Sequence, residues 1–115
     1  MDEDNVFKAL ADPTRRALLD LLFHEDGQTL NALCDHFGMS RYGIMKHLRI
    51  LEEAQLVTTR KVGRSKYHYL NPVPIQQAYD RWVSKYAQPF MTALTGLKSA
   101  LESETMTEQP AHIYQ

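Results

Sequence analysis

The strongest local pattern in the chain is a pair of short helical segments joined by a tight turn. Thr29 is placed to cap the first segment and Ser40 to cap the second. Apolar residues recur at helical spacing in both segments, as Leu30, Leu33 and Phe37 and then as Ile44, Leu48 and Leu51. Gly38 is expected to end the first segment with a left-handed backbone, leaving only Met39 and its neighbours between the helices. The pattern predicts a helix-turn-helix.

The hydrophobic period changes from helical to extended after Leu56. Residues 56–62 are rich in β-branched side chains, and residues 66–70 alternate between polar and apolar. Residues 63–65 lie between them and begin with a glycine, so the two runs are predicted to form a β-hairpin. A hairpin that directly follows a helix-turn-helix is typical of a winged helix.

Helices are predicted on both sides of this unit. A short helix over residues 5–11 carries Phe7, and Asp12-Pro13 is a helix start in which Asp caps and Pro occupies the first turn. A long last helix follows residues 71–72, and Pro89 is expected to bend it or remove one hydrogen bond. The predicted fold is therefore mainly α with a small β-hairpin, four helices preceding two strands and one helix following them. Residues 1–101 are predicted to form one winged-helix domain, and residues 102–115 a flexible tail.

Length and composition agree with a small soluble domain. The chain has 115 residues, 43% of them apolar, and no run long enough for a membrane span. The first residues are acidic where a secretory signal would be basic, and the single cysteine, Cys34, cannot form an internal disulfide. We expect a cytoplasmic protein.

Charge is distributed unevenly along the sequence. The net charge is −1, but residues 41–68 carry +5 and the rest of the chain −6. A basic stripe on an otherwise acidic protein is typical of a surface that binds phosphates. A solvated charged loop is the alternative interpretation.

The residue types of the second helix suit the major groove of double-stranded DNA. Arg41 lies in the first turn and has the geometry to bind guanine, and Met45 could contact a thymine methyl group. Lys46 and Arg49 are expected at phosphates, and the hairpin cations at the backbone or the minor groove. The predicted DNA-binding residues are Ser40, Arg41, Tyr42, Met45, Lys46, Arg49, Arg60, Lys61, Arg64 and Lys66.

Across residues 7–86 the chain resembles the arsenic-repressor family of bacterial regulators (ArsR/SmtB type). The resemblance rests on four segments, LADPTRR at 10–16, SRYGIMKHL at 40–48, LEEAQLV at 51–57 and GRSKY at 63–67. It implies a homodimer built from the first and last helices, a near-palindromic operator, and autoregulating repression that a signal releases. Met45 departs from the small residue usual at its position, so base preference is not transferred.

The predicted last helix carries a large apolar stripe. This agrees with the implied dimer, because one small core could not bury all of the stripe. The predicted dimer-interface residues are Phe7, Trp82, Tyr86, Phe90, Leu94 and Leu97. Packing of the stripe across its own domain is the alternative.

The donor residues do not match the metal sites of the resembled family. Its thiolate site uses a Cys-x-Cys pair where this chain has Thr29 and Asn31, and its other site needs an Asp-x-His pair that Asp80 does not begin. We expect no metal and no cofactor.

Candidate signals for release from DNA are a small apolar molecule, a partner protein and oxidation of Cys34. His47 is expected to have a structural role, such as a hydrogen bond that fixes the second helix, rather than that of a pH switch.

Two other classes of function are weighed against a DNA-binding regulator. A protein-docking module would favour an acidic or apolar outer face on the second helix, and this face is basic. An enzyme would need a nucleophile with a base, paired carboxylates or a phosphate loop, and the sequence has none of these patterns.

Overall fold

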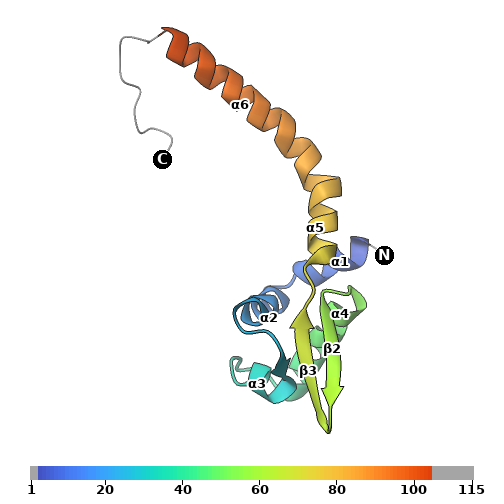
Figure 1. Ribbon diagram of the computed structural model, residues 1–115. Helices are drawn as coiled ribbons and strands as arrows, with labels where there is room; N and C mark the ends of the chain where they lie inside the picture. The colour runs from blue at the N-terminus through green and yellow to red at the C-terminus, as the bar shows by residue number, and fades with distance from the viewer. Residues whose placement is uncertain (1–2, 105–115) are drawn as a thin grey trace. The chain divides into compact units, whose positions relative to one another are not determined.

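The computed structural model describes residues 3–104, which divide into two units, residues 3–78 and residues 79–104. The first unit is a winged helix-turn-helix (Figure 1). Its elements are α1 (Glu3–Leu10), α2 (Pro13–His24), β1 (Gln28–Thr29), α3 (Leu30–Cys34), α4 (Arg41–Glu53), β2 (Val57–Val62), β3 (Ser65–Leu70) and α5 (Val73–Ala78). The second unit contains the π-helical turn η1 (Tyr79–Val83) and α6 (Ser84–Glu104). The predicted class, mainly α with a small β-hairpin, is confirmed.

Side-chain caps begin the helices where the sequence predicts them. The Asp12 carboxylate accepts hydrogen bonds from the backbone N–H groups of Thr14 and Arg15, at 2.9 and 3.2 Å. Thr29 accepts from the N–H of Ala32 at 3.2 Å. Ser40 accepts from the N–H of Gly43 at 3.1 Å and so fixes the first residue of α4.

The β-sheet has one strand more than the predicted hairpin. β2 and β3 pair antiparallel from Val57–Leu70 to Val62–Ser65, and the two-residue turn between them places Gly63 at φ +63°. A glycine with positive φ at the first turn position suits the right-handed twist of a hairpin. β1 pairs with the other edge of β3, where Gln28 lies opposite His68.

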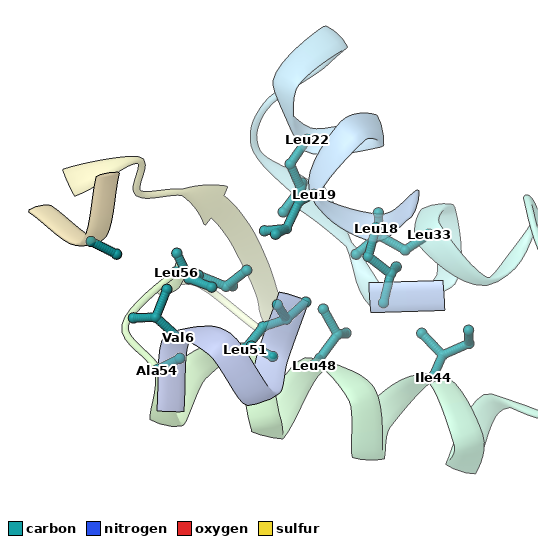
Figure 2. Packing of buried hydrophobic residues seen from close by; sticks show 13 residues of the cluster. Val6, Leu18, Leu19, Leu22, Leu33, Ile44, Leu48, Leu51, Ala54 and Leu56 are labelled. Atoms are coloured by element: carbon teal, nitrogen blue, oxygen red, sulfur yellow. The ribbon is translucent and has the colours of Figure 1, made fainter. Parts of the chain in front are cut away.

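The hydrophobic core of the first unit lies between α4 and the helices that precede it. Ile44, Leu48 and Leu51 point from α4 toward Leu18 and Leu22 on α2 (Figure 2). The buried cluster comprises Val6, Ala9, Leu18, Leu19, Leu22, Leu33, Ile44, Leu48, Leu51, Ala54, Leu56, Val57 and Ala78. The inner face of α4 is therefore fixed by packing, which determines the direction of its outer face.

Two details of the predicted turn are wrong. α3 ends at Cys34, so Phe37 packs against the core from the connection between the helices and not from the helix itself. That connection covers residues 35–40 and is longer than expected. Gly38 does not have a positive φ; the described residues with positive φ are Gly27, Gln55 and Gly63. A six-residue connection reverses the chain gradually and needs no left-handed residue at that position.

The predicted long last helix is interrupted. α5 ends at Ala78, and η1 follows before α6 continues through Pro89 to Glu104. Pro89 lacks an N–H to donate to the carbonyl four residues earlier, so α6 tolerates the loss of one hydrogen bond. α6 includes residues 102–104, which the sequence had placed in the tail, and residues 105–115 lie outside the described part of the chain.

Candidate nucleic-acid interface

The outer face of α4 is exposed along its length, because the opposite face is in the core. Ile44, Leu48 and Leu51 are buried at helical spacing. Every residue that the sequence assigns to DNA binding on or beside this helix is exposed: Ser40, Arg41, Tyr42, Met45, Lys46 and Arg49. The ammonium of Lys46 lies 5.6 Å from the centre of the Tyr42 ring, within range of a cation–π contact.

The β-hairpin presents the remaining predicted cations to solvent. Arg60 and Lys61 are exposed on β2, Arg64 is exposed in the turn and Lys66 is exposed on β3. Because β2 and β3 are joined by a two-residue turn, these charges lie close together on one narrow element.

A groove of about 610 Å³ lies between α4 and the hairpin and joins the two groups of cations. Arg41, Met45 and Arg49 line it from α4, and Arg64 and Lys66 line it from the hairpin. The other lining residues are Thr29, Leu30, Asn31, Leu48, Glu52, Ser65 and His68. The groove is not lined by the other five predicted DNA-binding residues, which are Ser40, Tyr42, Lys46, Arg60 and Lys61. The groove thus collects five of the ten predicted residues around one concave surface.

Two polar residues that the sequence does not assign to DNA binding contact these cations. The Oδ1 atom of Asn31 on α3 accepts a hydrogen bond from Nη1 of Arg41. The Oε1 atom of Glu52 on α4 lies 3.8 Å from Nζ of Lys66. Neither pair has a spacing along the sequence that reveals it, since the partners lie on different elements that only the fold brings together.

Arg15 connects α4 to the two helices that precede it. Its side chain is buried, and it donates from Nε to the carbonyl of Ala9 at 2.9 Å and from Nη2 to the carbonyl of Lys8 at 2.8 Å. Its Nη1 atom lies 3.2 Å from Nδ1 of His47 on α4. This contact is of the structural kind expected for His47.

The Asp12 carboxylate lies beside the same group of residues, with Oδ2 3.8 Å from Nδ1 of His47. Burial acts to raise the pKa of Asp12. The hydrogen bond from the Arg15 backbone, the charges of His47 and Arg15, and the hydrogen bond from Thr14 outweigh burial and lower this pKa below its ordinary value of 3.8. Asp12 is therefore a charged cap in the folded protein near neutral pH.

The predicted dimer-interface residues are all exposed. Phe7 on α1 is 44% exposed. In the second unit, Trp82, Tyr86, Phe90, Leu94 and Leu97 are exposed as well, spaced three or four residues apart as one helical face requires. The Lys85 ammonium lies 4.3 Å from the centre of the Trp82 ring and 5.2 Å from that of Tyr86.

Among residues 3–104, no three His, Cys, Asp or Glu side chains gather as a metal site would require. Cys34 is a half-buried free thiol at the edge of the core. None of the helices in the described range combines the length and the apolar character needed to cross a membrane.

An exposed basic helix beside a basic hairpin defines a winged helix-turn-helix transcriptional regulator.

Comparisons with known proteins agree with this class. A family described as a helix-turn-helix domain matches residues 10–60. The transcriptional repressor SdpR of Bacillus subtilis is 37% identical over 83 residues, which cover 72% of this chain and 90% of the relative. The regulator Rv2034 of Mycobacterium tuberculosis is 31% identical over 104 residues, covering 88% of this chain and 90% of the relative.

Solved structures give the same result. An ArsR family transcriptional regulator superimposes with a TM-score of 0.67 at 32% identity, covering 76% of this chain and 89% of its own. An ArsR-like regulator from Rhodococcus has a TM-score of 0.69 at 29% identity and covers 87% of this chain and 90% of its own. The chain belongs to the ArsR family of winged helix-turn-helix transcriptional regulators. Because its relatives are regulators, the prediction that it is not an enzyme is confirmed.

Proposed function

We propose that this protein is a sequence-specific repressor that binds double-stranded DNA as a homodimer, controls its own gene and does not respond to metal ions. The observation that carries the proposal is that the outer face of α4 and the hairpin cations are exposed together, with Arg49 of α4 and with Arg64 and Lys66 of the hairpin lining one groove. A helix of this diameter fits the major groove, where base edges differ between all four base pairs. The repressor named among its relatives supports the direction of regulation.

The contacts divide by residue type and position. Arg41 and Tyr42 lie in the first turn of α4, the part of a recognition helix that reaches base edges, with Met45 one turn later. Ser40, Lys46 and Arg49, with the hairpin residues Arg60, Lys61, Arg64 and Lys66, are assigned to the sugar-phosphate backbone. This division gives Arg41 a role in sequence preference and the hairpin a role in general affinity.

The exposed apolar stripe supports the homodimer. Tyr86 is 66% exposed and Phe90 64% in the single chain, and exposed aromatic patches are a liability for a monomer. We assign the stripe on η1 and α6, together with Phe7 on α1, to contacts with a second copy of the chain. Two symmetric copies would read a near-palindromic operator.

The donor chemistry of the chain supports a regulator without a metal response. Thr29 and Asn31 stand where the family's thiolate site would need two cysteines, and Thr29 instead caps α3. Neither a neutral hydroxyl nor an amide replaces a thiolate as a ligand for a soft metal ion.

Fluorescence anisotropy tests this function. The purified protein is titrated onto a labelled duplex from its own upstream region, with unlabelled random duplex as competitor, at 50 and 200 mM salt and with or without EDTA. We expect tight binding that survives the competitor, falls by about 10³- to 10⁵-fold between the two salt concentrations and is unaffected by EDTA. Equal, weak binding to both duplexes would contradict the proposal.

A further inference from the structure

Arg41 makes a side-chain hydrogen bond to a residue outside the recognition helix. Its Nη1 atom donates a hydrogen bond to Oδ1 of Asn31, which lies on α3. Both side chains are exposed, and both line the groove between α4 and the hairpin. The contact therefore lies at the surface that is proposed to meet DNA.

The Asn31 side chain has no other hydrogen-bond role in forming α3. Thr29 caps that helix through its hydroxyl, and the bond from the N–H of Asp35 goes to the backbone carbonyl of Asn31. Removing the Asn31 amide would leave both of these bonds in place. The amide thus affects the direction of Arg41 more than the stability of α3.

The guanidinium of Arg41 can contact a base while it is hydrogen-bonded to Asn31. Arginine has five N–H donors in a rigid plane, and the contact with Asn31 uses one of them on Nη1. The edge formed by Nε and Nη2 remains available for the two acceptors of guanine, O6 and N7. Holding a long side chain in one direction lowers the ordering cost of binding and disfavours bases that need another direction.

The neutral amide also leaves the charge of Arg41 intact. Lys66, in contrast, lies against the carboxylate of Glu52, which offsets its charge. An asparagine at position 31 can therefore orient Arg41 without weakening its attraction to DNA.

We propose that Asn31 is a positioning residue that sets the base preference of Arg41. This inference rests on the proposed function, because it requires that α4 reads base edges. It predicts that Asn31 affects the choice among sequences, with little effect on affinity for DNA in general.

The test is selection from a library of randomised duplexes, followed by anisotropy on the enriched duplex, its single-base variants and a random duplex. The variants are Arg41→Ala, Asn31→Ala, Asn31→Ser and Asn31→Asp. Gln77→Ala is the matched control, since Gln77 is an exposed polar residue on α5, remote in sequence from α3 and α4. Thermal unfolding of each variant checks that it is folded.

Arg41→Ala should abolish the preference at one base pair of each half-site. Asn31→Ala and Asn31→Ser should weaken the preference at that same base pair by about 3- to 10-fold and change affinity for random duplex by less than about 2-fold. Asn31→Asp keeps the acceptor, so it should retain the preference while lowering affinity for every duplex, since it adds a negative charge.

Three results would overturn the inference. The first is that Asn31→Ala and Asn31→Ser retain the full base preference. The second is that they lower affinity for the selected and the random duplex equally. The third is that Arg41→Ala leaves the base preference unchanged at every position. In each of these cases an enriched sequence for the wild type would still support the proposed function. If the wild type enriches no sequence, the proposed function fails and the inference fails with it.

Discussion

Nη1 of Arg15 on α2 lies 3.2 Å from Nδ1 of His47, in the middle of the recognition helix α4. A guanidinium only donates hydrogen bonds, so Nδ1 can accept from Arg15 only in the tautomer that carries the ring proton on Nε2. The same guanidinium donates to the carbonyls of Lys8 and Ala9 at the end of α1. One buried side chain thus connects three helices and fixes α4 from its inner side.

Arg15→Lys should destabilise the protein by about 2–4 kcal/mol, because a single ammonium cannot replace the three directed contacts of the guanidinium. Arg16→Lys is the matched control. Arg16 is exposed and makes one such bond, to the carbonyl of Leu10 at 2.7 Å, so its replacement should change stability by no more than about 0.5 kcal/mol. Chemical denaturation measures both, and equal effects would contradict the connecting role of Arg15.

Asp12 should make stability depend on pH in the acid range. Its pKa is lowered in the folded protein, so its charge stabilises the fold above the unfolded pKa near 3.8. This contribution is lost as the pH falls through the lower, folded pKa.

Asp12→Asn separates the charge from the cap, since asparagine caps helices about as well as aspartate. The variant should be less stable than the wild type at pH 7 and equally stable once the pH is below the folded pKa of Asp12. Asp12→Ala removes the cap too and should be less stable than Asp12→Asn by about 1 kcal/mol at every pH. Urea denaturation from pH 2 to pH 7 measures both variants, and a constant difference between wild type and Asp12→Asn would show that the charge has no part.

Glu52→Gln should increase affinity for random duplex by about 2- to 5-fold, because it frees Lys66 for a phosphate and removes a negative charge from the groove. The salt dependence should become steeper by up to about one released ion per site. Stability should change by less than about 1 kcal/mol, as is usual for exposed pairs.

Glu53→Gln is the control for this change, since Glu53 is exposed and does not line the groove. Glu53→Gln changes the net charge of the protein by the same +1 as Glu52→Gln. If both variants gain equal affinity, net charge is the cause and the pairing with Lys66 is not.

Tyr86→Asp should dissociate the dimer, because it places a charge in the middle of the apolar stripe. Gln88→Asp introduces the same charge two residues along α6, about half a helical turn away, and should leave the dimer intact. Sedimentation velocity gives the mass of each species. Trp82, the only tryptophan, reports the same change through its emission, which should move to longer wavelength in Tyr86→Asp alone. An intact dimer in Tyr86→Asp would place the interface elsewhere.

The local elements of the fold could be predicted because each is determined by nearby residues. Asp12, Thr29 and Ser40 cap the helices that the sequence assigns to them. The burial of Ile44, Leu48 and Leu51 follows from their spacing, and it determines which residues of α4 are exposed. The exposed outer face of α4 could therefore be predicted from the sequence.

The features that the sequence did not predict depend on contacts between distant segments. β1 has only two residues, and it exists because β3 offers a free edge to Gln28 and Thr29. The contacts of Asn31 with Arg41 and of Glu52 with Lys66 join separate elements, with no periodic pattern to reveal them. Gln55 has a left-handed φ of 62° at the end of α4, where glycine is more usual, so composition alone did not indicate that turn.

The division of labour between α4 and the hairpin is tested most directly by comparing Arg41→Ala with Lys61→Ala on a selected duplex and a random duplex across a range of salt concentrations. Arg41→Ala should cost about 1–3 kcal/mol on the selected duplex and much less on the random one. Lys61→Ala should weaken both duplexes equally and reduce the salt slope by about one released ion per site. If the two variants weaken both duplexes by the same factor, α4 does not read base edges through Arg41, and the proposed mode of recognition is wrong.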